Sequence, residues 1–168
     1  MTSTHQAFHP AFAGSRHDHE RCAHAALDEA ARVCASQGAR LTAVRRQVLE
    51  LIWRSHAPIG AYDLLAALNG AGRKAAPTTV YRALEFLLRH GLIHRIESRN
   101  AYVGCALPSR HHVGQFLICR ACGNAAEIDD SAIARAIARS TASLGFAPER
   151  IAVEISGRCE RCAAADRA

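Results

Sequence analysis

The sequence has few aromatic residues and no long apolar segment. Only 5% of its 168 residues are aromatic, with a single Trp, which disfavours an aromatic-rich β-sandwich. No apolar run approaches the roughly 20 residues that a membrane-spanning helix needs. Because 49% of the residues are hydrophobic, the chain can still bury a core. We therefore expect a helix-rich globular protein of one or two compact domains.

The first residues also lack the pattern of an export signal, a basic stretch followed by an apolar one. We therefore expect a cytoplasmic protein with no membrane partner. The seven cysteines would then be kept reduced, and close cysteine pairs in that setting bind metal more often than they form disulfides.

Basic residues outnumber acidic ones mainly in the middle of the chain. Residues 37–99 carry ten Lys and Arg against four acidic residues, whereas residues 1–36 and 100–168 have net charges of −1 and +1. The formal net charge of +6 therefore comes from the middle segment. Such a basic surface is typical of proteins that contact the DNA phosphate backbone, although it also occurs for solubility alone.

The middle segment has the pattern of a winged helix-turn-helix, in which the last helix enters the major groove and a β-hairpin, the wing, contacts the backbone. Apolar spacing and capping residues predict four helices: one over 20–37, one that begins after Thr42, one over 61–69, and one from Thr78 or Thr79 to Gly91. Runs of β-prone residues then predict strands over 92–97 and 101–104. On the helix that follows Thr42, the spacing leaves Arg45 on the polar face.

The remaining chain predicts a small α/β domain, so the fold class is α+β. Its expected elements are strands over 116–118, 125–128 and 151–155 and a helix from Ser131 to Gly145. The resulting divisions are a flexible tail at 1–19, a winged-helix domain at 20–104, a linker at 105–115 and the α/β domain at 116–168.

Four cysteines form two matched pairs, Cys119 with Cys122 and Cys159 with Cys162, in a C-x2-C-x36-C-x2-C pattern. Two residues between cysteines let both sulfurs approach one ion, and two such turns complete a tetrahedral thiolate shell for zinc. We call these residues the four-cysteine cluster. Its closed shell predicts a structural zinc whose binding, at about 10–16 kcal/mol in zinc-finger peptides, is part of folding.

A redox dithiol and a deaminase zinc site both fit the cysteine pairs less well. A thioredoxin-like dithiol usually occurs once, at a helix N-terminus, whereas here two matched pairs are present. A zinc deaminase needs an H-x-E motif and a P-C-x-x-C motif, and neither occurs.

A second metal site is predicted from residues near the hairpin and linker: His94, Cys105, His111 or His112, and Glu127. Taken singly, His94 could be a half-exposed strand residue, Cys105 a buried thiol and Glu127 a surface acid. Together they supply nitrogen, sulfur and oxygen from separate segments, so the site would form only in one relative orientation of the two domains. Such a site can act as a sensor, because metal concentration becomes a conformational population. One thiolate favours zinc over iron or manganese.

Three motifs resemble the ferric uptake regulator family of metal-dependent repressors, and within it the zinc uptake regulators. The motifs are PTTVYRAL at 77–84, HRIESRNAYV at 94–103 and CRACG at 119–123. The resemblance implies an N-terminal winged-helix domain and a C-terminal dimerisation domain in a homodimer. When loaded with zinc, this dimer would bind a palindromic DNA operator and repress zinc-uptake genes.

The resemblance also implies roles for individual residues. The four-cysteine cluster would hold one structural Zn²⁺ per chain, and the positions that match the regulatory ligands are His94, Cys105, His112 and Glu127. Tyr62 and Arg82 match base-contacting positions, and we expect Thr79 and Tyr81 to lie at the DNA with them. An Arg suits this role because its guanidinium reads guanine in the major groove.

Two departures from the family pattern favour zinc as the sensed metal. Iron- and peroxide-sensing relatives usually have a histidine where Pro58 stands, and their His-His-Asp-His run is reduced here to His111 and His112. Of these two, the distance to Cys119 favours His112. The alternative within the fold is a sensor of iron, manganese, nickel or peroxide.

Two alternatives lie outside that class. A zinc-dependent or thiol-redox enzyme is disfavoured, because the sequence has no Ser/His/Asp set, paired catalytic carboxylates or phosphate loop. We therefore expect no enzymatic activity and no small-molecule substrate. The other is an interaction module with one structural zinc and no regulation.

Overall fold

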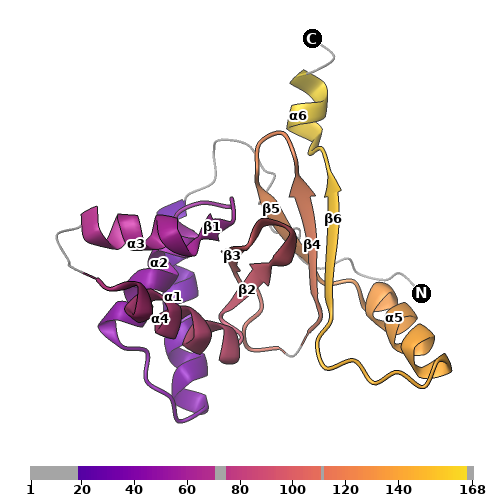
Figure 1. Cartoon of the computed structure of the whole chain (residues 1–168), viewed down its shortest axis with the longest axis horizontal. Coiled ribbons are helices and arrows are strands. Elements are labelled where there is room, and N and C mark those ends of the chain that lie inside the picture. Colours follow the sequence, from indigo (N-terminus) through magenta and orange to yellow (C-terminus); the bar gives the residue numbers. More distant parts are fainter. Residues whose placement is uncertain (1–18, 71–74, 111, 166–168) are drawn as a thin grey trace.

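The computed structural model describes residues 19–70, 75–110 and 112–165. The tail predicted at 1–19 lies outside this part except for its last residue, and His111 lies outside it as well. The described chain is an α+β fold of two lobes (Figure 1). Of the described helices, none is both long and apolar enough to cross a bilayer.

The N-terminal lobe, residues 19–104, combines four helices with a small antiparallel sheet (Figure 1). The sheet has the strand order β1-β3-β2, and a 3-10 turn, η2, joins β2 to β3. The elements in chain order are α1 (His19–Ser36), α2 (Ala43–Trp53), β1 (Ile59–Gly60), α3 (Ala61–Gly70), α4 (Pro77–Arg89), β2 (Ile93–Ile96), η2 (Glu97–Arg99) and β3 (Ala101–Gly104).

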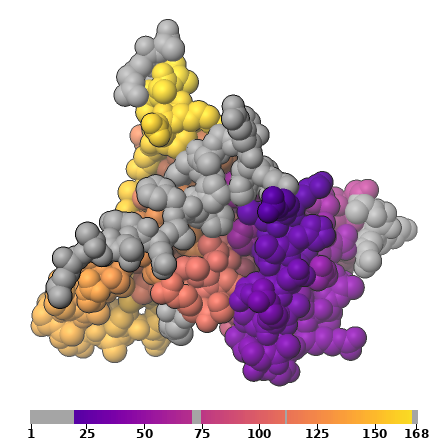
Figure 2. Space-filling model, turned by 180° about the vertical axis from the view of Figure 1, so that it is seen from behind, coloured from indigo at the N-terminus to yellow at the C-terminus, as the bar shows by residue number. Residues whose placement is uncertain are grey.

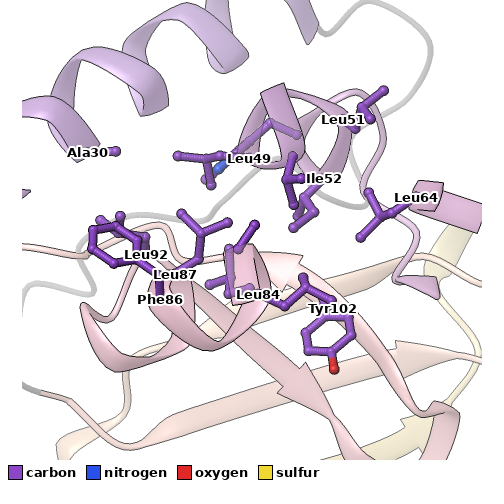
Figure 3. Close-up of a cluster of buried hydrophobic side chains, with 14 of the residues drawn as sticks. Ala30, Leu49, Leu51, Ile52, Leu64, Leu84, Phe86, Leu87, Leu92 and Tyr102 are labelled. Atoms are coloured by element: carbon purple, nitrogen blue, oxygen red, sulfur yellow. The ribbon is translucent and has the colours of Figure 1, made fainter. Parts of the chain in front are cut away.

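The core of this lobe lies between the helices (Figure 3). On α4, Val80, Leu84 and Leu87 recur at the spacing of one helix face, and all three are buried. They pack with buried residues of α1, α2 and α3. The opposite face of α4 is therefore left to solvent, and Gly91, at a φ of +66°, ends the helix as predicted.

The C-terminal lobe, residues 112–165, is a three-stranded sheet with two helices. The central strand β4 pairs antiparallel with β5 and parallel with β6. Figure 2 shows this lobe, ending in the yellow α6, beside the indigo and purple helices of the N-terminal lobe. Its elements are β4 (Gly114–Cys119), β5 (Ala125–Ile128), α5 (Ser131–Ser143), β6 (Ala152–Gly157) and α6 (Glu160–Ala165).

A small apolar cluster joins the two lobes. Ile96 and Val103 from the hairpin are buried together with Phe116 and Ile118 of β4 and with Ala125 of β5. A backbone hydrogen bond also connects the lobes, since the Ala125 N–H donates to the His56 carbonyl at 2.9 Å. The hairpin therefore rests on the C-terminal sheet.

Several details differ from the sequence-based expectations. α4 begins at Pro77 after the N-cap Ala76, not at Thr78 or Thr79, since proline suits the first helical position. Arg45 does not simply face solvent, because its guanidinium lies 3.5 Å from the centre of the Phe86 ring. β4 begins at Gly114, two residues before the predicted start at 116, because its pairing with β6 extends to that residue. The strand therefore includes the last two residues of the predicted linker.

Candidate metal centres

The four-cysteine cluster is assembled by the parallel pairing of β4 and β6. Cys119, the last residue of β4, pairs with Gly157 at the end of β6, so the two cysteine turns leave the same edge of the sheet. Cys159 then immediately precedes α6, and Cys162 lies within it. All four sulfurs lie within 4.8 Å of one another, and the Sγ atoms of Cys122 and Cys159 are 3.9 Å apart.

The surroundings of this cluster favour a thiolate at Cys119, whereas contacts with the other cysteines and burial raise the pKa of Cys162 to about 12. Backbone N–H groups of Cys122 and Cys159 lower the pKa of Cys119, and the donor of Cys159 lies 3.4 Å from the Cys119 Sγ. The guanidinium of Arg161 faces Cys122 and supplies a positive charge. Four sulfurs, one of them poised to ionise, fit a tetrahedral zinc whose ligands would be about 3.8 Å apart.

The mixed cluster consists of His94, Cys105, His112 and Glu127. One ligand atom from each lies within 4.8 Å of the others. His94 is on β2, Cys105 follows β3, His112 precedes β4 and Glu127 is on β5. The N-terminal lobe thus supplies His94 directly and fixes Cys105 through a bond from its N–H to the Leu92 carbonyl at 3.1 Å, while the C-terminal sheet carries Glu127.

Glu127 Oε1 is the point on which the mixed cluster converges. It lies 2.6 Å from Nε2 of His112 and 2.9 Å from Nε2 of His94, and Cys105 Sγ lies 3.6 Å from Nε2 of His112. Ligands of a tetrahedral zinc are about 3.3–3.8 Å apart. Moving the imidazoles and the carboxylate apart by under about 1 Å would therefore admit an ion.

Backbone groups orient two of these side chains. Nδ1–H of His112 donates to the Arg110 carbonyl at 2.8 Å, which leaves Nε2 directed at the cluster. The Ala106 N–H donates to Oε2 of Glu127 at 2.8 Å, which leaves Oε1 for the same purpose. Nε2 of His94 is buried and forms no hydrogen bond of good geometry in the described structure. A buried nitrogen aimed at other donors fits a metal-binding role.

The charges of the mixed cluster are set by burial and by mutual contact. Burial opposes ionisation of Glu127, but the hydrogen bond from His112 and the close approach of the His94 imidazole lower its pKa overall. The hydrogen bond to Glu127 raises the pKa of His112, and both of its ring nitrogens face acceptors. Burial, then the charge of Glu127, raises the pKa of the Cys105 thiol. Without metal, the cluster therefore holds a proton on Cys105, and below the raised pKa of His112 it holds an additional proton on that imidazole.

The residues expected at DNA lie on the helical lobe. Tyr62, in the first turn of α3, is 77% exposed, and Tyr81 on α4 is 48% exposed. Arg82 is exposed and Thr79 is partly exposed on the same helix. These side chains are therefore accessible for contact with a ligand outside the chain.

The sequence reasoning named all eight cluster residues, and the structure gathers them into two groups of four. It did not find the Arg110 carbonyl or the Ala106 amide, because backbone groups carry no side-chain signal. His112 lies in the mixed cluster, but His111 is outside the described residues, so the choice between the two stays a prediction.

Comparisons with known proteins agree on one family. The sequence profile of the ferric uptake regulator family matches residues 36–156. The zinc uptake regulation protein of Escherichia coli (strain K12) is 39% identical over 137 residues, covering 81% of this chain and 80% of that protein. A solved zinc uptake regulator complexed with zinc and DNA is 36% identical, with a TM-score of 0.82, covering 87% of this chain and 98% of that one.

One further relative has been solved in two states. Holo XcZur has a TM-score of 0.76 at 40% identity, covering 82% of this chain and 96% of its own. Apo XcZur has a TM-score of only 0.50 at 38% identity, covering 84% and 97%. With a profile match over most of its length and a relative at 39% identity, this chain belongs to the ferric uptake regulator family.

Proposed function

We propose that this protein is a zinc-responsive transcriptional repressor. As a zinc-loaded homodimer it binds a palindromic DNA operator and represses genes of zinc uptake. The observation that carries the proposal is the mixed cluster, whose four donors come from both lobes yet lie within reach of a single ion. The protein acts as a regulator and not as an enzyme, in keeping with the relatives it resembles.

The mechanism follows from where the donors are attached. His94 moves with the hairpin of the N-terminal lobe, and Glu127 moves with the C-terminal sheet. A bound zinc ion would supply a positive centre that attracts all four donors. Since the donors meet only when the hairpin rests on the sheet, occupancy of the mixed cluster favours that orientation over others. In a dimer, this orientation fixes the spacing of the two DNA-reading helices.

The solved relatives support this coupling. The present arrangement is similar to that of the regulator bound to zinc and DNA and to holo XcZur, and it is much less similar to apo XcZur. All three cover more than four fifths of this chain at comparable identity. We therefore assign the described arrangement to the zinc-loaded, DNA-binding state.

We propose two zinc ions per chain with different roles. The four-cysteine cluster lies wholly within the C-terminal lobe, so its ion stabilises that lobe and does not report on orientation. The mixed cluster spans the lobes and serves as the sensor. Its single thiolate, from Cys105, favours zinc over iron or manganese, and Pro58 offers no ligand where iron-sensing relatives have a histidine.

The homodimer is inferred from an unburied apolar surface on the C-terminal lobe. No residue of α5 is buried, although the helix is amphipathic. Leu144 is 83% exposed, Phe146 is 62% exposed, and Ile155 on the edge strand β6 is 45% exposed. An amphipathic helix and a sheet edge of this kind are stabilised when a second copy covers them.

The domain roles follow from this arrangement. We infer that residues 20–104 form the winged-helix domain and that the chain from β4 onward, beginning at Gly114, forms the dimerisation domain, so that the linker predicted at 105–115 is shortened by two residues. α4 presents Arg82, Tyr81 and Thr79 to the major groove, and α3 presents Tyr62. The basic charge of residues 37–99 contributes phosphate contacts, so operator binding falls steeply with salt.

The test measures operator affinity against buffered free zinc, starting from a dimer that retains its tightly held zinc. We expect strong binding only after a second equivalent per chain is added, and we expect Cys105→Ser to abolish that response while leaving a folded dimer. Operator binding that is unchanged when the second equivalent is chelated would refute the sensor role. Restoration by iron, manganese or nickel in place of zinc would change the identity of the sensed metal.

A further inference from the structure

A further, polar contact between the lobes lies near the mixed cluster and contains none of its residues. The carboxylate of Glu154 on β6 accepts hydrogen bonds from the backbone N–H of Glu97 at 2.6 Å and of Ser98 at 3.2 Å. Arg150 adds an ion pair, with its guanidinium 2.7 Å from the Glu97 carboxylate. We call Glu154, Arg150, Glu97 and Ser98 the hairpin latch.

The hairpin latch provides an acceptor for two backbone N–H groups that have none within their own turn. Glu97 and Ser98 open the 3-10 turn η2, whose first N–H groups have no partner within the turn. Ile96, the residue before them, provides no side-chain cap. Glu154 is 57 residues away in sequence from Glu97, so it caps the turn only when the hairpin lies on the C-terminal sheet.

The hairpin latch and the mixed cluster share the same two segments. On the C-terminal sheet, Phe116 of the central strand is the register partner of both Glu127 and Glu154. Residues that face each other across a ladder project from the same side of a sheet. The sensor carboxylate and the latch carboxylate therefore stand in one row, about 10 Å apart across two strand spacings.

The hairpin shows the same pairing of roles. His94, the sensor ligand, lies three residues before Glu97 on the continuous segment formed by β2 and η2. Its ring packs edge-on against Phe116, with centroids 5.2 Å apart. Any motion that lifts the hairpin from the sheet therefore separates His94 from Glu127 and Glu97 from Glu154 together.

We propose that the hairpin latch is a zinc-independent fastening that sets the free zinc concentration at which the protein switches to operator binding. The proposal rests on the repressor function inferred above. Glu154 and Arg150 are positioning residues, since they bind neither the ion nor the operator.

The effect follows from the population of the closed arrangement. The latch stabilises the orientation in which the four donors of the mixed cluster meet, so it raises the fraction of chains that are ready to bind zinc. The apparent dissociation constant for the ion equals the intrinsic constant divided by that fraction. Loss of the latch therefore raises the zinc requirement, whereas saturating zinc still drives the chains to the closed arrangement.

The test compares Glu154→Ala with wild type and with Glu149→Ala as a matched control. Glu149 is exposed and makes no hydrogen bond or ion pair within the described part of the chain. Zinc affinity of the mixed cluster is measured without DNA by competition with a chromophoric chelator, and operator affinity is measured across buffered free zinc.

For Glu154→Ala we expect both zinc midpoints to rise about five- to tenfold, as for a typical coupling between sites, with wild-type operator affinity at saturating zinc. Glu149→Ala should match wild type. Glu154→Gln, which keeps one acceptor oxygen, should fall between wild type and Glu154→Ala. Retention of the four-cysteine zinc and of the dimer, measured by metal analysis and light scattering, shows that each variant is folded.

Three results would overturn the proposal. A midpoint shift below twofold in Glu154→Ala would mean that the latch does not hold the lobes. Operator affinity that stays low at saturating zinc would place Glu154 in folding or DNA contact instead. If wild type itself showed no zinc-dependent operator binding, the repressor function would fail first and the latch proposal with it.

Discussion

Gly104→Ala is expected to destabilise the protein because the position has no room for a side chain. A Cβ there would lie 2.2 Å from Cε2, 2.3 Å from Nε1 and 2.6 Å from Cζ2 of Trp53. Unstrained carbon contacts are about 3.5–4.0 Å, so the indole would have to shift by more than about 1 Å. Trp53 is 8% exposed at the end of α2, held by the helical core.

The magnitude follows from this overlap. Overpacking of a well-packed core costs about 1–3 kcal/mol. A cavity of about 30 Å³ borders both Trp53 and Gly104, and it relieves part of the strain. We therefore expect a loss of about 2 kcal/mol in the free energy of unfolding, a roughly 30-fold change in the ratio of folded to unfolded chains.

The assay is urea unfolding at fixed zinc, followed by the fluorescence of Trp53, the single Trp of the chain. Gly104→Ala should lower the midpoint without changing the slope, and it should weaken zinc binding through the adjacent Cys105. Gly70→Ala is the control, because its Cβ would meet nothing within 4 Å. A wild-type midpoint with unchanged emission in Gly104→Ala would refute the packing argument.

Four further predictions concern the proposed function. Cys122→Ser should unfold the C-terminal lobe and release its tightly held zinc, as measured by circular dichroism and metal analysis; a folded, zinc-retaining variant would contradict this. Zinc binding to the mixed cluster should release about one proton, from Cys105, above the raised pKa of His112, and about two protons below that pKa. Zinc affinity should therefore fall with falling pH. Calorimetry in two buffers counts the protons, and the release of none would contradict the assignment. Arg82→Ala should weaken operator binding by about 1–3 kcal/mol, with unchanged zinc affinity in the absence of DNA. Leu144→Glu should shift the dimer to monomer in sedimentation experiments, and an unchanged dimer would move the interface elsewhere.

Local patterns in the sequence were enough to predict most helices and the four-cysteine cluster, whereas the choice of residues for the mixed cluster also relied on the resemblance to the family. The spacing of Val80, Leu84 and Leu87 specifies a buried helix face, and paired cysteines specify a metal site by themselves. Pro77 also indicated the correct start of α4, because proline favours the first helical position. The start was placed too late because Thr78 and Thr79 are also suitable capping residues.

The remaining features depend on contacts between distant segments. β1 has only two residues and exists because Ile59 and Gly60 pair with β3. The parallel register of β4 and β6 is set by packing that no local pattern encodes. Glu154 has the appearance of an ordinary charged residue on an edge strand, and only the fold brings it to η2. Contacts of this kind are missed because their partners are backbone groups, which every residue has.

The parallel pairing of β4 with β6 affects the order in which the protein can be assembled during synthesis. Glu127, the last member of the mixed cluster, is added to the chain before β6 is synthesised, and the second cysteine pair follows β6. Cys162 is added 35 residues later, so the third strand of the sheet carrying Glu127 and then the four-cysteine cluster are completed only within that interval. At about 5–20 residues per second this interval lasts about 2–7 s. An unfinished chain therefore carries every residue of the mixed cluster before the sheet that holds Glu127 and the four-cysteine cluster are complete.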